Sequence, residues 1–391
     1  MSNKPMAAKA EVSKETLSLE DVSALCALFD GVHLPLREHK TLFGGYSGTS
    51  IRVTGADGAR AVLKIVHGYT MADAANQAAV AAHAASAGFT GVCAPLPLAA
   101  DATRCVYERG DGTPVMMLSF VDGVAADKVL AEADGPKGSA LLRSVGGGLA
   151  ALHSVPVDGG AARRLRHCEG GSGACDVAKH MSGELLEKMR ASAHTRAHPF
   201  LTGFYEAEVA SLNESMRASE LPRGLLHGDP FLDNMLVAAT TGELRGLVDL
   251  EDFCVGPLLF DVACCASASC FRPDGALDLR RLRALLEGYA AVRPLTAGER
   301  RHFLSFMRLT MLCNWWAAPA RARHIRRPRP PPATTPARPR LRRLATLSAP
   351  PTGTGACSAA LPPHTWRLGR SRVRRRPPLP PQHVALCQLQ H

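Results

Sequence analysis

The stretch that decides the fold runs from residue 224 to 261 and reads GLLHGDPFLDNMLVAATTGELRGLVDLEDFCVGPLLFD. His227 and Asp229 are separated by a single glycine, and four residues separate Asp229 from Asn234. Asp249 follows fifteen residues after Asn234, at the end of a second apolar run. Two carboxylates and an amide in this order offer one base and two oxygen ligands for a hard cation.

This spacing matches the pattern H-x-D-x-x-x-x-N, followed by a metal-binding Asp after a later strand, that enzymes of phosphoryl transfer use. We therefore predict that Asp229 accepts or orients the proton of a substrate hydroxyl, and that Asn234 and Asp249 bind Mg²⁺. His227 is expected to brace the loop rather than to take part in the chemistry. The alternative is a plain turn followed by a solvated strand end, and the position of Asp249 behind an apolar strand argues against it.

A glycine-rich turn and a lysine form a second candidate group. Residues 40–66 read KTLFGGYSGTSIRVTGADGARAVLKIV, which predicts three strands joined by a glycine-rich loop and a tight turn. Lys64 lies in the third strand, predicted over Ala61–Val66, where a lysine can meet the phosphates of a nucleotide. The chain has no G-x-x-x-x-G-K-[ST] motif, which disfavours a P-loop. The loop can offer backbone N–H groups or hydroxyls to phosphates from Gly45, Ser47 and Thr49.

The chain divides into four parts. A flexible arm (1–16) precedes a small lobe (17–123) with a helix over 17–30, antiparallel strands and a second helix over 72–87. Residues 117–123 form an extended linker that can offer backbone groups to an adenine ring. The next part (124–316) reads as a larger, mainly helical lobe, with helices expected over 138–153, 199–218, 278–291 and 298–316 and short strands over Met235–Ala238 and Leu244–Leu250.

The fourth part, residues 317–391, is rich in Arg and Pro. The formal net charge is +11, but residues 319–391 hold fifteen Arg and no acid, so the rest of the chain carries −4. Fifteen of the 28 prolines also fall there, and we expect this tail to be disordered. Two interpretations stay open: a basic tail that binds anionic partners, or the product of a shifted reading frame. Nucleic acid is disfavoured as a partner except through this tail.

Composition also indicates the cellular compartment in which the protein works. No run of 18 or more uncharged apolar residues occurs, so no membrane span is expected. The twelve cysteines contain no C-x-x-C, and reduced thiols of a cytoplasmic protein fit this pattern best.

Taken together, these residues resemble the aminoglycoside phosphotransferase/choline kinase superfamily over roughly residues 18–316. Within it the chain is most similar to type II homoserine kinases. The resemblance rests on the stretches LPRGLLHGDPFLDNML, LRGLVDLEDF, GPLLFDVA and ALLEGYAAVRPLTAGE, of which we expect no chemistry from the last. It implies an α+β, bilobal, protein-kinase-like fold with a small antiparallel-sheet lobe and a larger helical lobe. It also implies ATP and Mg²⁺ as cofactors and a small-molecule hydroxyl as substrate, with L-homoserine the first choice.

The resemblance also implies roles for single residues. Ser119 and Val121 would contact adenine through their backbones, and Asp261 would brace the catalytic loop. Gln77 stands where many members place a Glu that pairs with the lysine, and Leu250 replaces the usual Phe after the metal-binding Asp. Hydroxylysine, choline, ethanolamine and aminoglycosides stay open as substrates, as does a catalytically impaired, kinase-like binding protein.

Overall fold

The computed structural model describes residues 15–42, 48–133, 135–157, 203, 206–208, 210, 221–272 and 274–322, with side chains up to Met311 in the last helix. Most of the predicted arm and tail, Gly45, Ser47 and nearly all of the helix predicted over 199–218 lie outside the described residues.

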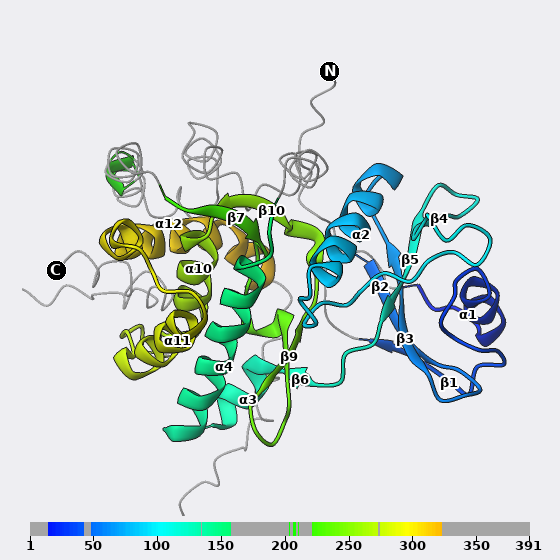
Figure 1. Cartoon of the computed structure of the whole chain (residues 1–391), viewed down its shortest axis with the longest axis horizontal. Helices are drawn as coiled ribbons and strands as arrows, with labels where there is room; N and C mark the ends of the chain where they lie inside the picture. Colours follow the sequence, from blue (N-terminus) through cyan, green and yellow to red (C-terminus); the bar gives the residue numbers. More distant parts are fainter. Residues whose placement is uncertain are drawn as a thin grey trace, which may run out of the picture.

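The smaller lobe is built on a five-stranded antiparallel sheet with strand order β1-β2-β3-β5-β4 (Figure 1). Both of its helices begin with a capping box, in which the N-cap hydroxyl and the Asp three residues later satisfy each other's backbone N–H groups, at Ser18 and at Thr70. The strands are β1 (Glu38–Leu42), β2 (Gly48–Thr54), β3 (Arg60–Val66), β4 (Tyr107–Glu108) and β5 (Pro114–Ser119), and the helices are α1 (Leu19–Cys26) and α2 (Met71–Ser86).

The two faces of this sheet have different partners. On one face, Leu63 and Met117 share a buried cluster with Val22 of α1. On the other face, Val66 and Met116 pack with Ala74 of α2. Because side chains alternate along a strand, Lys64 shares its face with Val66, on the α2 side of the sheet.

The larger lobe holds most of the helices and two small sheets (Figure 1). Strands β6, β8 and β9 form one antiparallel sheet, and β7 pairs with β10. The strands are β6 (Val124–Ala125), β7 (Arg223–Leu226), β8 (Met235–Val237), β9 (Leu244–Leu247) and β10 (Cys254–Pro257). The α-helices are α3 (Ala126–Glu132), α4 (Pro136–His153), α10 (Leu259–Ser269), α11 (Leu279–Val292) and α12 (Ala297–Ala322), and the 3₁₀ turns are η2 (Leu232–Asn234) and η3 (Leu250–Asp252).

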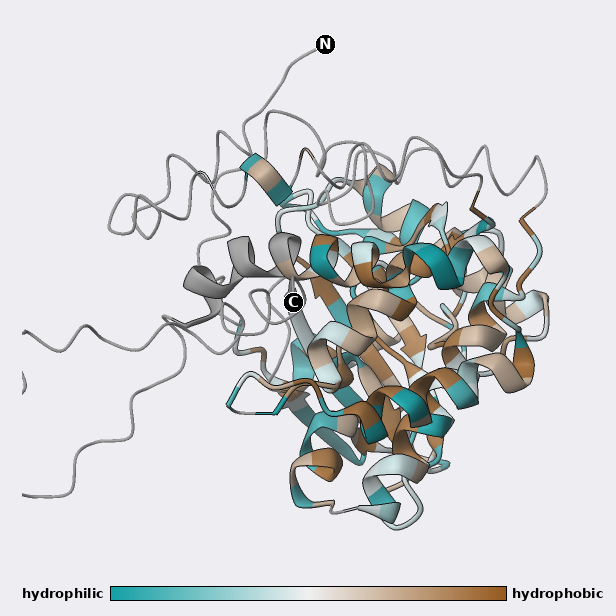
Figure 2. Cartoon of the chain, turned by 90° about the vertical axis from the view of Figure 1, so that its left-hand side faces the viewer, coloured by the Kyte–Doolittle hydropathy of each residue, from teal (hydrophilic) through white to brown (hydrophobic). Residues whose placement is uncertain are grey.

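Two predicted boundaries are wrong. The strand expected over Leu244–Leu250 ends at Leu247, because the chain turns into the left-handed region at Asp249 and then into η3. The tail was expected to begin at residue 317, but the α12 backbone continues to Ala322. Figure 2 shows that the helices carry both hydrophilic and hydrophobic residues, as expected for helices with one face against a core. None of the helices in the described part of the chain is long and apolar enough to cross a membrane.

Helices α4 and α11 approach each other closely enough to exclude side chains at their crossing. A Cβ placed on Gly146 would lie 2.1 Å from the Leu285 carbonyl oxygen, and one on Gly288 would lie 2.0 Å from the Arg143 carbonyl oxygen. Glycines inside a helix usually weaken it, but here they let two backbones touch. The close crossing brings polar side chains near the C-terminal end of α4 within reach of α11.

Candidate active site

The loop after β7 carries Asp229 and is ordered by its own side chains. The Asn234 amide Nδ2 donates to the Asp229 carbonyl oxygen (2.9 Å) and to its carboxylate oxygen Oδ2 (3.2 Å). Gly228 has φ of 83°, a conformation that glycine adopts without strain. Since the amide nitrogen faces Asp229, the Asn234 side-chain oxygen lies on the other side of the planar amide, where it can bind a cation.

His227 is buried and connects the two acidic positions of the site. Its Nε2 lies 3.0 Å from the Val248 carbonyl oxygen, to which only a protonated nitrogen can donate. Its Nδ1 accepts the backbone N–H of Asp229 at 3.3 Å. The imidazole therefore joins the backbone of Asp229 to the residue that precedes Asp249. The ring packs edge to face on Phe253, with centroids 5.4 Å apart.

Asp261, in the first turn of α10, holds the same loop from behind. Its side chain is fully buried. Oδ2 accepts the His227 backbone N–H at 2.6 Å, and Oδ1 accepts the Gly228 backbone N–H at 3.1 Å. Oδ2 also lies 3.2 Å from Nε2 of His153 on α4. A buried carboxylate with these donors fixes the backbone that leads into Asp229.

Lys64 and Asp249 meet across the two lobes. The Lys64 Nζ donates to Asp249 Oδ1 at 3.0 Å, and the two side chains are 11% and 24% exposed. Asp249 has φ of 62° and ψ of 67°, a left-handed conformation that costs a non-glycine residue energy and that often marks a functional site. Gln77 is buried on α2. Burial raises the pKa of the Cys93 thiol to about 11, although the nearby Lys64 charge lowers it in part, so this thiol is neutral at pH 7.

The register of β2 and β3 corrects one candidate phosphate ligand. Ser50 pairs with Lys64, whereas Thr49 pairs with Ile65, so the Thr49 side chain lies on the face opposite Lys64. The Thr49 hydroxyl is buried there, accepts the backbone N–H of Glu15 at 3.0 Å and lies 3.3 Å from His67 Nε2. The prediction that this hydroxyl reaches phosphates beside Lys64 does not fit this register. Ser50 is the hydroxyl on the correct face, and strand alternation was the signal that could have found it.

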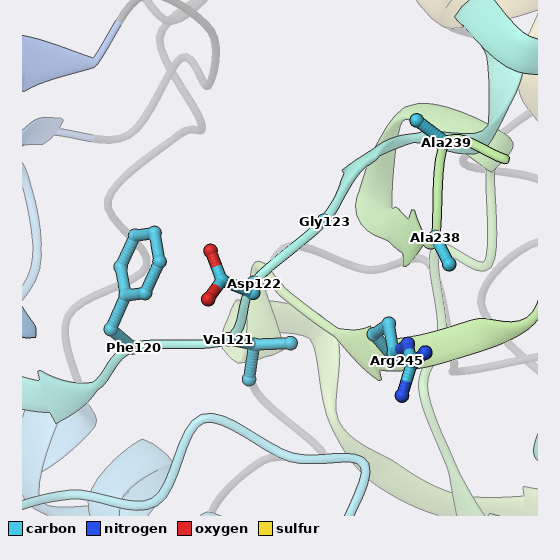
Figure 3. A pocket seen from close by; sticks show the side chains of 7 residues that line it. All are labelled: Phe120, Val121, Asp122, Gly123, Ala238, Ala239 and Arg245. Carbon is cyan, nitrogen blue, oxygen red and sulfur yellow. The ribbon is translucent and has the colours of Figure 1, made fainter.

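The linker between the lobes is held on both sides. Ser119 is clamped to Ala94 by two hydrogen bonds, from the Ser119 backbone N–H to the Ala94 carbonyl (2.8 Å) and from the Ala94 N–H to the Ser119 hydroxyl (2.9 Å). The Val121 side chain lies against Gly246 of β9. A pocket of about 530 Å³ adjoins this linker (Figure 3). Its lining residues are Phe120, Val121, Asp122, Gly123, Ala238, Ala239 and Arg245, so the pocket does not include the catalytic polar groups.

Asn234 and Asp249 are suited to a magnesium ion by the kind of atoms they offer. Mg²⁺ prefers oxygen ligands and is usually held by one or two carboxylates together with substrate phosphates and water. In the described ranges, no group of three or more His, Cys, Asp or Glu side chains is arranged as a metal site. This donor set fits a cation that arrives with a nucleotide rather than one held by the protein alone.

The comparisons with known proteins agree with this geometry. The model of the phosphotransferase enzyme family matches residues 38–295, more than half of the chain. The chain belongs to this family. The matched range includes every described residue of the site, from Lys64 to Asp261.

Curated relatives of this chain include homoserine kinases, and the chain spans less than two thirds of the length of several of them. The chain is 31% identical to that of Rhodopseudomonas palustris (strain ATCC BAA-98 / CGA009), over 59% of this chain and 66% of the relative. It is 32% identical to that of Xanthobacter autotrophicus, over 62% of this chain and 70% of the relative. It spans 56% of the homoserine kinase of Gluconacetobacter diazotrophicus.

Solved structures show that the chain has a protein-kinase-like fold. The amicoumacin kinase hAmiN, in complex with AMP-PNP, Ca²⁺ and amicoumacin, superposes with a TM-score of 0.55 at 12% identity, over 76% of this chain and 84% of that one. An aminoglycoside phosphotransferase from Alicyclobacillus acidocaldarius gives a TM-score of 0.53 at 16% identity, over 79% and 88%. The expected fold class, with a small antiparallel-sheet lobe and a larger helical lobe, is confirmed.

Sequence reasoning missed polar residues that lie behind the loop that carries Asp229. His153 is buried and contacts Asp261, and its other ring nitrogen lies 2.7 Å from the Tyr289 hydroxyl. Tyr289 belongs to the stretch ALLEGYAAVRPLTAGE, from which no chemistry was expected. The contact joins residues 136 positions apart in the chain, so no local pattern indicates it.

Proposed function

We propose that this chain catalyses the transfer of a phosphoryl group from ATP to a hydroxyl of a small metabolite, with Mg²⁺ as the cation. The observation that carries the proposal is a backbone link between two hydrogen-bonded pairs: the Val248 N–H, next to Asp249, donates to the Asn234 carbonyl oxygen at 2.9 Å. Asn234 holds the Asp229 carboxylate in one lobe, and Lys64 of the other lobe reaches Asp249. A base, two oxygen ligands and a lysine in one place are what phosphoryl transfer requires.

Asp229 is the catalytic residue in this proposal. Its Oδ2 is fixed by the Asn234 amide, and its backbone N–H is held by His227. A carboxylate in a fixed position orients the acceptor hydroxyl and takes its proton as the new P–O bond forms and the bond from the γ-phosphorus to the departing ADP breaks. Catalysis then rests on positioning and on neutralising charge, and needs no phosphorylated form of the protein.

Lys64, Asp249 and Asn234 are proposed to hold the phosphate end of the nucleotide. Asp249 and Asn234 would hold the cation, which would neutralise negative charge on the phosphates. The Lys64 ammonium is already directed toward this position by Asp249, and it donates to phosphate oxygens once the nucleotide arrives. The backbones of Gly45, Ser47, Ser119 and Val121 are proposed as further nucleotide contacts, and the Ser50 side chain is added to them.

L-Homoserine is the proposed acceptor. The support is the 31% and 32% identity to homoserine kinases, together with the kinase site described above. Aminoglycosides form a second candidate class, since a neighbour in fold is an aminoglycoside phosphotransferase. Cys26, Cys93, Cys105, Cys265 and Cys270 are thiols, which supports the proposal of a reducing, cytoplasmic location.

An ATP-consumption assay over L-homoserine, hydroxylysine, choline and kanamycin tests the proposal. We expect turnover that requires Mg²⁺ and is highest with L-homoserine, with O-phosphohomoserine as the product detected by ³¹P NMR. Highest turnover with another acceptor would replace the substrate and keep the reaction class. If no acceptor is phosphorylated while the protein is folded and binds ATP, the proposed activity is wrong.

A further inference from the structure

A buried line of polar side chains runs from the junction of α11 and α12 to the catalytic loop. Arg293 Nη1 donates to the Glu299 carboxylate (2.9 Å) and to the Tyr289 hydroxyl (3.0 Å). The Tyr289 hydroxyl lies 2.7 Å from His153 Nδ1, and His153 Nε2 lies 3.2 Å from Asp261 Oδ2. Asp261 in turn accepts backbone N–H groups from the loop that carries Asp229.

The direction of each proton in this line follows from what each group can do. An arginine side chain only donates, so the Tyr289 hydroxyl accepts from Arg293 and its own proton points to His153 Nδ1. His153 Nδ1 is then an acceptor, and its proton is on Nε2, from which it donates to Asp261. Arg293, Tyr289 and His153 thus form one unidirectional chain of donors that ends on the carboxylate holding the loop.

The side chains of this line are buried, so each hydrogen bond between them contributes more than it would at the surface. His153, Tyr289 and Glu299 are buried, and the Arg293 side chain is 17% exposed. In such surroundings water does not replace a lost partner, and hydrogen bonds in a chain polarise one another. Glu299 has a second role, since it forms a capping box with Thr296 at the start of α12. Substitutions of Tyr289 and Arg293 therefore test the line without removing the cap of α12.

We propose that Tyr289 and Arg293 are positioning residues for phosphoryl transfer. They fix the tautomer of His153 and the orientation of Asp261, and Asp261 sets the backbone that presents Asp229 to the acceptor. The proposal rests on the proposed kinase activity for its kinetic consequence. Its structural consequence, the protection of the His227 and Gly228 amides, does not depend on any substrate.

The test compares Tyr289→Phe with Glu287→Gln. Tyr289→Phe removes the hydroxyl and keeps the ring, which packs edge on against His153 with centroids 5.6 Å apart. Glu287→Gln breaks the exposed pair between Arg143 of α4 and Glu287 of α11, which joins the same two helices outside the line. Measured on the full chain are kcat, KM for ATP and for L-homoserine, and hydrogen–deuterium exchange of the peptide that contains residues 225–229.

For Tyr289→Phe we expect kcat to fall by roughly tenfold to a hundredfold, since small displacements of a catalytic group have effects of this order, with both KM values within about twofold. Exchange at residues 225–229 should become faster, while exchange of the β2–β3 hairpin, which serves as the internal reference, stays unchanged. Arg293→Met should show the same pattern, and Arg293→Lys, which keeps a donor, should lose less. Glu287→Gln should match wild type in every measurement.

The proposal is overturned if Tyr289→Phe matches Glu287→Gln in both kcat and exchange. It is also overturned if exchange rises equally in the hairpin, because the variant would then act through global stability. Should the wild-type chain phosphorylate none of the acceptors, the proposed activity fails, and the exchange comparison still decides whether Tyr289 positions the loop.

Discussion

The two sides of the active site are held in different ways. Within the larger lobe, Asp229 is held by the Asn234 amide, and the backbone that leads into it is held by N–H groups bonded to Asp261. Lys64 comes from the smaller lobe, and its ion pair is with Asp249 of the larger one. On α2, where the family resemblance leads one to look for an acid, the chain has the buried amide of Gln77.

This difference separates a preorganised part of the site from an assembled part. The base side presents its carboxylate in the nucleotide-free protein, and little has to move before reaction. The lysine side is bonded to Asp249, one of the two proposed cation ligands. Its ammonium must share or release Asp249 when phosphates and the cation arrive. The predictions below test this contrast, beginning with the largest effect.

Removal of the base should give the largest loss. For Asp229→Ala we expect kcat to fall by about 10³-fold, within the 10²- to 10⁴-fold range of a positioned general base, while ATP affinity changes little. Steady-state kinetics and calorimetric titration with ATP measure both. The control is Asp233→Ala, an exposed acid in η2 four positions after Asp229, which should retain full activity. If Asp229→Ala kept full activity, Asp229 would not be the base, and the contrast between a preorganised base and an assembled lysine side would not hold.

Lys64→Met tests the assembled side. The loss of a charge-assisted hydrogen bond to phosphate should weaken ATP binding by roughly tenfold to a hundredfold. In the nucleotide-free protein the effect on metal binding has the opposite sign. The variant removes the Lys64 hydrogen bond to Asp249 together with a positive charge, so Mg²⁺ or Mn²⁺ should bind more tightly. Titration calorimetry with ATP measures the loss of nucleotide affinity, and titration with the metal ion in the absence of ATP measures the gain in metal affinity.

The matched control for Lys64→Met is Lys40→Met, at an exposed position of β1. It should change neither titration. If Lys64→Met weakens metal binding in the absence of ATP, then the Lys64–Asp249 pair does not compete with the cation, and the lysine side is as preorganised as the base side.

The crossing of α4 and α11 supports the preorganised side and can be tested through stability. Gly288→Ala places a methyl group 2.0 Å from a backbone oxygen, and we expect overpacking to cost about 1–3 kcal/mol of unfolding free energy. Gly147→Ala, in the same pair of helices, meets its nearest atom at 3.6 Å. It should be neutral or stabilise by up to about 1 kcal/mol, since alanine favours the helix. Urea denaturation of both variants provides the comparison.

The sequence predicted the base side better than the lysine side for a physical reason. Asp229 and Asn234 are five positions apart on one loop, so their spacing alone brings them together. The bond between Lys64 and Asp249 spans 185 positions and depends on how two lobes dock. The first contact is local and is visible in the chain, whereas the second is a property of tertiary packing.

Two other misses have equally definite causes. The Thr49 hydroxyl was one of the groups expected at the phosphates, but the register of β2 places this side chain on the face opposite Lys64, since a shift of one position in a strand exchanges the two faces. A contact through the Thr49 backbone N–H stays a prediction. The stretch that contains Tyr289 and Arg293 contributed to the family resemblance, but nothing in its sequence indicated a role for either residue. Its partner His153 is polar and buried on a distant helix, and only the α4–α11 crossing reveals the contact.

The smallest effect is expected at the linker between the lobes. Arg60 forms a two-pronged pair with Asp122, and its guanidinium lies 4.5 Å from the centre of the Phe120 ring. The two charged side chains are 40% and 69% exposed, so water and salt screen the pair. For Asp122→Asn we expect no measurable change in ATP affinity and a melting temperature at pH 7 equal to that of wild type.

A change should appear only in acid, and its sign can be derived. The hydrogen bond from Arg60 lowers the pKa of Asp122 below its ordinary value of 3.8. A carboxyl group whose pKa is lower in the folded state stabilises the protein above its unfolded pKa and loses that contribution as the pH falls through the folded value. Between pH 5 and pH 2, approximate limits that bracket this titration, the melting temperature of wild type should therefore fall slightly more than that of Asp122→Asn. A large effect of this variant at pH 7 would mean that the linker pair, and not the Lys64–Asp249 pair, sets how the lobes meet.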